Sequence, residues 1–147
     1  MILTLPYPIS NNVYWRTRSY KGRSITYVSP EAVAYKTAVG LISRVAGVRT
    51  PIAGRIALSI SLYPSRPQDW ERRAKKDPHG WDDTIKCIDL DNAQKVLLDA
   101  LKNVVFEDDK WVRSITAERM TPDGEARVIV GIKKWEARAC EPLFRRQ

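Results

Sequence analysis

Residues 89–109 read DLDNAQKVLLDALKNVVFEDD, and this stretch contains the strongest structural signal in the chain. Apolar side chains recur at helical spacing through residues 92–104, at Ala93, Val96, Leu97, Ala100, Leu101 and Val104. This spacing predicts an amphipathic helix that buries one face. Asp91 and Gln94 have the spacing of a capping box, so we expect Asp91 to cap the helix.

The segments around this helix predict a small mixed sheet. Strands are expected at residues 2–5, 25–28, 55–63, 112–119 and 126–134. A second helix should run from Pro30 to about Ala46, because Ser29 is a favourable N-cap and proline suits the first helical position. We therefore expect an α+β fold, with one domain over residues 1–147 and two main helices packed on the sheet. Residues 65–86 are expected to form an extended loop insertion and residues 135–147 a basic tail.

Composition narrows the classes of function. The chain of 147 residues suits one domain, and no apolar run is long enough to span a membrane. The N-terminus has no basic segment followed by a long apolar run, so no secretory signal is expected. The two cysteines are expected to be reduced, in a cytoplasmic protein. A single histidine argues against the usual zinc sites and against a histidine-based catalytic triad.

The charge of the chain is unevenly distributed. Its net charge is +8, yet residues 89–109 carry six acids and two lysines, which leaves the other residues at +12. A basic balance suits a polyanion, most plausibly nucleic acid, although many small proteins are basic for no specific reason. Six carboxylates would repel a phosphate ligand. One economical explanation is that they hold a metal cation.

The acidic residues have spacings that could build such a site. Asp89 and Asp91 would point to the same side of an extended segment. Asn92, Lys95 and Asp99 would share one helical face, and Asp108 and Asp109 could return toward it. Carboxylates suit Mg²⁺ or Mn²⁺, which can activate water for phosphodiester hydrolysis. An N-cap, an Asp99–Lys95 ion pair and a turn would explain the same residues separately, but their combination favours the metal site.

Two motifs resemble those of a known family. DLDNAQKVLLDAL followed by EDDKWV, together with LPYPISNNVYWR near the N-terminus, is similar to the RusA-type Holliday junction resolvases of bacteria and their phages. The resemblance implies a RusA-like α+β fold and a homodimeric, Mg²⁺-dependent nuclease, with Mn²⁺ as a substitute, that nicks opposing strands of a four-way DNA junction. By position, Asp89, Asp91 and Asp109 would be metal ligands and Lys95 the essential lysine. Asn92, Asp99 and Asp108 match motif positions with a supporting role.

Basic residues outside the motif are candidates for DNA contact. We expect DNA-binding roles for Asn12, Arg16, Arg18, Lys21 and Arg23, and, in the insertion, for Arg72, Arg73, Lys75 and Lys76. A nearly neutral, solvated insertion is the alternative for residues 65–86. Two other functions remain open: a junction-binding protein without catalysis, and a nuclease for other branched or flapped DNA in phage genome processing.

Overall fold

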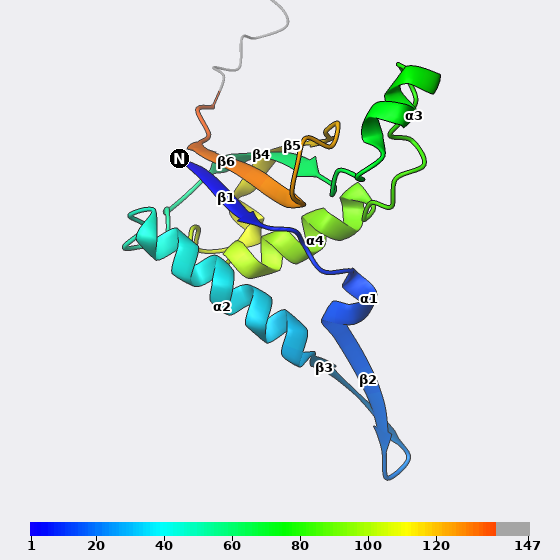
Figure 1. Cartoon of the computed structure of the whole chain (residues 1–147). Helices are drawn as coiled ribbons and strands as arrows, with labels where there is room; N and C mark the ends of the chain where they lie inside the picture. The colour runs from blue at the N-terminus through cyan, green and yellow to red at the C-terminus, as the bar shows by residue number, and fades with distance from the viewer. Residues whose placement is uncertain (138–147) are drawn as a thin grey trace, which may run out of the picture.

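The computed structural model describes residues 1–137, and its centre is a four-stranded mixed sheet (Figure 1). The strand order is β1-β6-β4-β5. The strands are β1 (Ile2–Pro6), β4 (Ile56–Tyr63), β5 (Val112–Arg119) and β6 (Arg127–Lys134). β6 pairs antiparallel with β1 and β4, whereas β4 and β5 are parallel. The expected strands of the sheet are confirmed to within one residue at each end.

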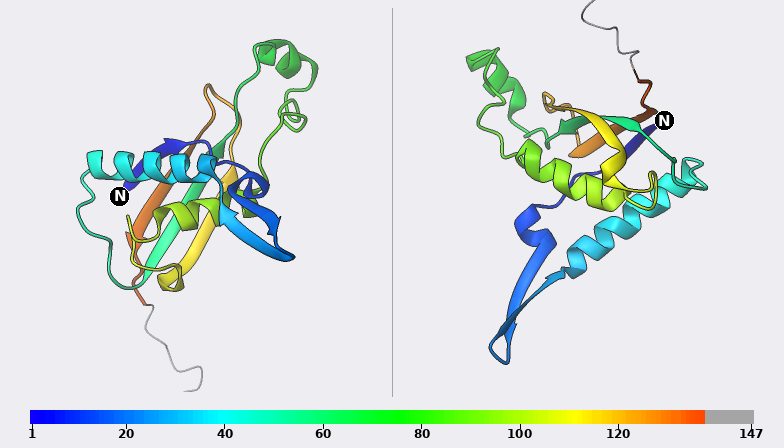
Figure 2. Two further views of the ribbon diagram at one scale, coloured as in Figure 1. Left: turned by 90° about the horizontal axis from the view of Figure 1, so that it is seen from below. Right: turned by 180° about the vertical axis from the view of Figure 1, so that it is seen from behind.

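Two helices cover one face of this sheet (Figures 1 and 2). They are α2 (Pro30–Val45) and α4 (Leu90–Leu101), which contact each other. Ser29 is buried and its Oγ accepts a hydrogen bond from the Ala32 N–H at 3.1 Å, which confirms the predicted cap of α2. The core lies between the helices and the sheet. The predicted α+β class, with a mixed sheet and two main helices, is confirmed.

The ends of α4 differ from those expected. The helix begins at Leu90, so Asp89 and not Asp91 occupies the N-cap position, and Asp91 lies in the first turn. The reason is that Asp89 is extended while its carbonyl already accepts the Ala93 N–H at 2.9 Å. The helix ends at Leu101 rather than at residue 104 because Asn103 has a φ of 61°, in the left-handed region.

A hairpin that projects from the body extends the expected short strand at residues 25–28. It consists of β2 (Trp15–Tyr20) and β3 (Arg23–Val28), and it follows the short helix α1 (Asn11–Tyr14). Lys21 and Gly22 have φ values of 48° and 74°, as in the two-residue hairpin turn that suits the twist of paired strands. Of the hairpin residues only Val28 is partly buried, so the hairpin stands in solvent as an arm (Figure 2).

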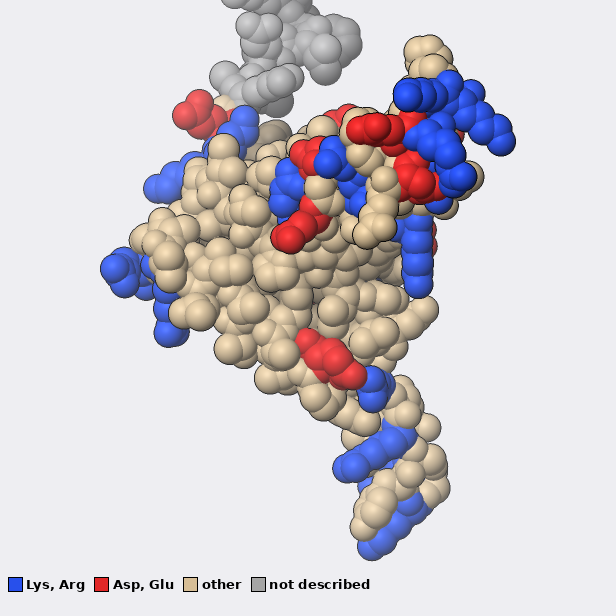
Figure 3. Space-filling view, in the orientation of Figure 1, with Lys and Arg blue, Asp and Glu red and all other residues tan. Residues whose placement is uncertain are grey.

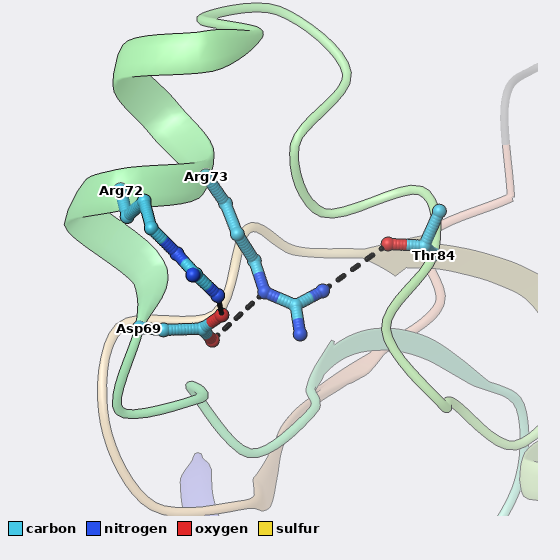
Figure 4. A network of polar contacts seen from close by, with 4 residues as sticks. All are labelled: Asp69, Arg72, Arg73 and Thr84. Carbon is cyan, nitrogen blue, oxygen red and sulfur yellow. Dashed lines mark hydrogen bonds and ion pairs between the residues drawn. The ribbon is translucent and has the colours of Figure 1, made fainter.

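Residues 65–86 form a second projection, the α3 arm. The expectation of a loop without secondary structure is wrong here, because α3 (Trp70–Lys76) lies inside it. The prolines at 64, 67 and 78 flank this helix instead of interrupting it. Asp69 binds Arg72 and Arg73, and Arg73 also donates to the Thr84 Oγ1 (Figure 4). In the described part of the chain, no helix has the length and apolar character needed to cross a membrane.

Candidate active site

Asp89 and Asp91 are exposed at the beginning of α4. A tyrosine from the segment after β1 holds the backbone that leads to them. The hydroxyl of Tyr7 accepts a hydrogen bond from the Ile88 N–H at 2.9 Å and donates to the Cys87 Sγ at 3.3 Å. Burial, with a smaller contribution from the bond to Cys87, raises the pKa of Tyr7 to about 12. Tyr7 therefore fixes the chain directly before the first aspartate.

The beginning of α4 carries four of the candidate residues within two turns. Lys95 Nζ lies 3.9 Å from Asp91 Oδ2, and the two side chains are 63% and 71% exposed. Asn92 and Asp89 line a hollow of about 610 Å³ together with Tyr7, Asn12 and Lys86. This hollow lies between α1, from which the hairpin projects, and the base of the α3 arm. The acidic pair is thus open to a ligand as large as a nucleic acid.

The remaining acidic candidates lie toward the other end of α4. Lys102 Nζ is 3.6 Å from Asp108 Oδ2 and 3.5 Å from Asp109 Oδ1. Asp99 pairs with Lys36 of α2, at 3.1 Å, so the predicted alternative of an Asp99–Lys95 pair is not what the structure shows. Burial raises the pKa of Asp99, the Lys102 ammonium opposes this rise, and the nearby Asp109 carboxylate adds to it.

Phe106 fixes the loop that carries Asp108 and Asp109. Its side chain is fully buried, and its carbonyl accepts the Asn103 N–H at 2.7 Å. The Asp108 carboxylate accepts the Lys110 N–H at 3.0 Å, and this bond holds the pKa of Asp108 below its usual value. The buried Phe106 side chain and these backbone hydrogen bonds therefore hold the acidic loop in place, independently of the beginning of α4.

The candidate metal ligands have the oxygen donors that a divalent cation prefers, but the structure does not bring them together at one point. Carboxylate oxygens are the donors that Mg²⁺ and Mn²⁺ prefer. Within residues 1–137, however, no three Asp, Glu, His or Cys side chains lie close enough together to hold a metal ion. Asp91 and Lys102 are eleven residues apart, or about 16 Å of helix axis, and Lys102 holds Asp109. Asp91 pairs with Lys95, whereas Asp108 and Asp109 share Lys102, so the three proposed ligands do not meet at one point.

The candidate DNA-binding cations fall on the two arms (Figure 3). In the hairpin, Arg16 is tied to Glu31 at 2.7 Å. In the α3 arm, Arg72 and Arg73 are both tied to Asp69, at 2.7 and 2.8 Å. The face of the body seen between the arms in Figure 3 is mostly uncharged. Figure 3 thus shows cations on both arms, with carboxylates among those of the α3 arm, and further cations at the left edge of the body.

The cations that remain available are fewer than the sequence indicated. Over residues 1–137, no carboxylate oxygen lies within the 4.0 Å ion-pair distance of Arg18, Lys21 or Arg23. The same holds in this range for Lys75 and Lys76, which are exposed at the end of α3. Asn12 differs from these residues, because it lines the hollow beside Asp89 instead of an arm.

Sequence reasoning missed three residues that shape the site: Tyr7, Lys36 and Lys102. Lys102 lies within the stretch that opened the sequence analysis, and its place after the last turn of α4 could have indicated a partner for the following acids. Tyr7 lies between two prolines in the N-terminal motif, which gave no sign of its bond to the backbone of Ile88. Lys36 reaches Asp99 from a different helix, which no local pattern reveals.

Comparison with known proteins identifies the family of the chain. A search of curated proteins finds no match to the chain. A family model described as Endodeoxyribonuclease RusA matches residues 6–133, which include the N-terminal motif, both arms, α4 and the acidic loop. Proteins of this family are hydrolases that cut phosphodiester bonds in DNA. The chain therefore belongs to the RusA endodeoxyribonuclease family.

Proposed function

We propose that this endodeoxyribonuclease resolves four-way DNA junctions by paired, symmetric nicks that depend on Mg²⁺, with Mn²⁺ as a substitute. The observation that carries the proposal is the exposed Asp89–Asp91 pair at the beginning of α4, with Lys95 one turn from Asp91. The cationic hairpin lies on one side of it, and the α3 arm, which carries six cations and five acids, lies on the other. Family membership provides the general activity and the divalent-metal dependence. The cysteines of the chain fit a reducing, cytoplasmic setting in a bacterial or phage-infected cell.

In this proposal Asp89, Asp91 and Asp109 hold the cation, which would supply an activated water when bound. Asp109 is assigned as the third ligand from its position in the family motif, and in this structure Lys102 holds it at 3.5 Å, toward the other end of α4. The ammonium of Lys95 is placed to stabilise charge that develops on the cleaved phosphate. Tyr7 keeps the backbone ahead of Asp89 in place through the Ile88 N–H.

Supporting roles follow from position. Asn92 shares the hollow with Asp89 and can orient a nucleotide beside the cut. Asp108 shares Lys102 with Asp109, and Asp99 binds Lys36 of α2. Among the cations, Arg18, Lys21, Arg23, Lys75 and Lys76 can contact phosphates directly, whereas Arg16, Arg72 and Arg73 would first exchange their carboxylate partners. Asn12 would act from the hollow.

A homodimer is part of the proposal, because two-fold symmetry matches a substrate with two equivalent strands to cut. The outer face of α2 supports a second copy. Val33, Leu41 and Val45 are 54%, 63% and 82% exposed, and their spacing places them along one side of the helix. An apolar stripe of this kind on a helix is a common mark of a protein interface.

The test is cleavage of a synthetic four-way junction by the wild type, by Asp91→Asn and by the matched control Asp83→Asn, an exposed aspartate of the α3 arm. We expect symmetric nicks that require Mg²⁺ and are abolished only by Asp91→Asn, while that variant still binds the junction. Unchanged cleavage by Asp91→Asn would contradict the assignment.

Two other functions are separated by the same experiment. Tight junction binding without nicks, in Mg²⁺ and in Mn²⁺, would identify a binding protein without catalysis. The other alternative is a nuclease for other branched DNA. The α3 arm supports it, because this arm adds a second contact surface beside the site. Faster cleavage of a flap than of a four-way junction would support that candidate.

A further inference from the structure

The two faces of the β2–β3 hairpin differ sharply in chemistry. Because side chains alternate along a strand, one face carries Arg16, Arg18, Tyr20, Arg23, Ile25 and Tyr27. The opposite face carries Trp15, Thr17, Ser19, Ser24, Thr26 and Val28. The 3.0 Å contact between the hydroxyls of Thr17 and Thr26 is consistent with this division. We call the first the cationic face and the second the hydroxyl face.

Cations and rings are interleaved on the cationic face and at the tip of the hairpin. The Arg18 guanidinium lies 5.8 Å from the centre of the Tyr27 ring, and the Lys21 ammonium lies 5.4 Å from that of Tyr20. Such contacts hold the charged groups close to the sheet surface and leave their donors free. The side chains therefore form a surface on which charge and flat apolar groups alternate.

The hairpin gains little stability from the rest of the molecule. Residues 15–28 contain four cations and no acid, and the only ion pair joins Arg16 at the base to Glu31, within the described chain. An isolated two-stranded hairpin is marginally stable in water. Six residues at about 3.3 Å each make an arm roughly 20 Å long. This length and charge suit a polyanion, and a two-stranded ribbon fits the major groove of DNA.

We propose that the hairpin binds one duplex arm of the branched substrate through its cationic face and its tip, with Arg18, Lys21 and Arg23 on phosphates and Tyr20 and Tyr27 against the adjacent sugars and bases. The hydroxyl face stays away from the DNA. This inference rests on the proposed DNA substrate and adds which surface meets it. Arg16 acts at the base of the hairpin, where Glu31 holds it in place.

The test uses pairs of adjacent positions that change the net charge equally but lie on opposite faces. Arg18→Gln is compared with Ser19→Glu, and Arg23→Gln with Ser24→Glu, and each of the four substitutions lowers the net charge of the protein by one. Junction affinity is measured without divalent cation, as a function of salt, in an Asp91→Asn background. Thermal unfolding of each variant verifies that the exposed substitutions leave the fold intact.

Each arginine variant should lower the slope of log K against log salt by about 0.9, which corresponds to about eightfold weaker binding at 0.1 M salt. Each glutamate variant should change affinity less than twofold. Equal losses from both faces would overturn the inference, because they would show that only net charge matters. No loss from any variant would overturn it as well.

Two further outcomes keep the inference and the proposed function distinguishable. Failure of the parent protein to bind any branched DNA would remove the proposed function itself. Binding that survives the arginine substitutions would remove only the role of the hairpin. If the glutamate variants weaken self-association, as measured by sedimentation, while the arginine variants leave DNA binding unchanged, the hairpin meets a second copy and the inference is wrong.

Discussion

Replacing Tyr14 with phenylalanine should stabilise the protein, although Tyr14 lies at the base of the hairpin. The Tyr14 side chain is 1% exposed, and within residues 1–137 its hydroxyl is buried without a hydrogen-bond partner. Its ring packs edge-on against Trp15, with centroids 5.2 Å apart. The backbone carbonyl of Tyr14 accepts the Ser29 N–H at 2.9 Å, a bond that the substitution preserves. The change therefore removes an unsatisfied polar atom and leaves the packing in place.

The size of the effect follows from the cost of burying that hydroxyl. An unsatisfied buried donor costs about 1–3 kcal/mol, and part of this cost is relieved in solution by small movements. We expect Tyr14→Phe to raise the free energy of unfolding by about 1 kcal/mol. In a chain of this size that corresponds to a rise in Tm of roughly 2–4 °C.

Thermal and urea unfolding, followed by circular dichroism, would measure the change in stability. Tyr20→Phe is the matched control, because Tyr20 is 57% exposed in the hairpin and its hydroxyl stays hydrated. It should leave stability unchanged. A fall of 1 kcal/mol or more for Tyr14→Phe would refute the reasoning, since it would mean that the hydroxyl has a partner in solution.

Three further predictions concern the surroundings of the candidate active site and the tip of the hairpin. Tyr7→Phe leaves the Ile88 N–H unpaired and should slow cleavage with little effect on binding. The pKa of the Tyr7 hydroxyl is raised from 10.0 to about 12. The neutral hydroxyl therefore stabilises the fold fully below pH 10, and this stabilisation is lost as the pH rises through 12. Urea unfolding should show a smaller loss of stability between pH 10 and 12 for Tyr7→Phe than for the wild type. Phe106→Leu removes fully buried ring volume, which should lower the free energy of unfolding by about 1 kcal/mol. The loop before Asp109 then loosens, so the cleavage rate should fall more than the junction affinity. A fall in affinity alone would contradict this. Lys21→Asn should stabilise the protein slightly, because asparagine tolerates the φ of 48° better than lysine, and should weaken DNA binding in a filter assay; unchanged affinity would show that the tip does not touch DNA.

The parts of the fold that the sequence predicted are those with a buried face. The alternation in β4 and the apolar stripe of α4 both follow from burial against one core, so their periods could be read directly. β2 has the pattern WRTRSY and is exposed on both faces, so it shows no apolar alternation and was missed. α3 is a polar helix of seven residues, about two turns, without a buried residue, and it was missed for the same reason.

The candidate site divides in a similar way. Asp91 and Lys95 are four residues apart, so helical spacing alone places them together. Asp89 and Asp91 were expected to share one side of an extended segment, which is wrong because α4 begins at Leu90 and Asp91 lies in its first turn. The position of Asp109 depends on Lys102 and on the burial of Phe106, which are tertiary effects. Spacing shows which carboxylates could meet, but not which lysine each of them takes in the folded chain.

The arrangement of charge connects the arms to the chemistry. The hairpin and the α3 arm project on either side of the beginning of α4 in all three ribbon views (Figures 1 and 2), and both arms carry Lys and Arg side chains (Figure 3). A phosphate drawn toward the arms meets Asp89 and Asp91 between them, where it would be repelled unless a cation intervened. DNA binding therefore requires positive charge near this surface, whereas metal binding requires negative charge on it. Under the proposed function, distributing the cations over two arms would let the DNA bind while the carboxylates remain available for the divalent metal on which the family depends.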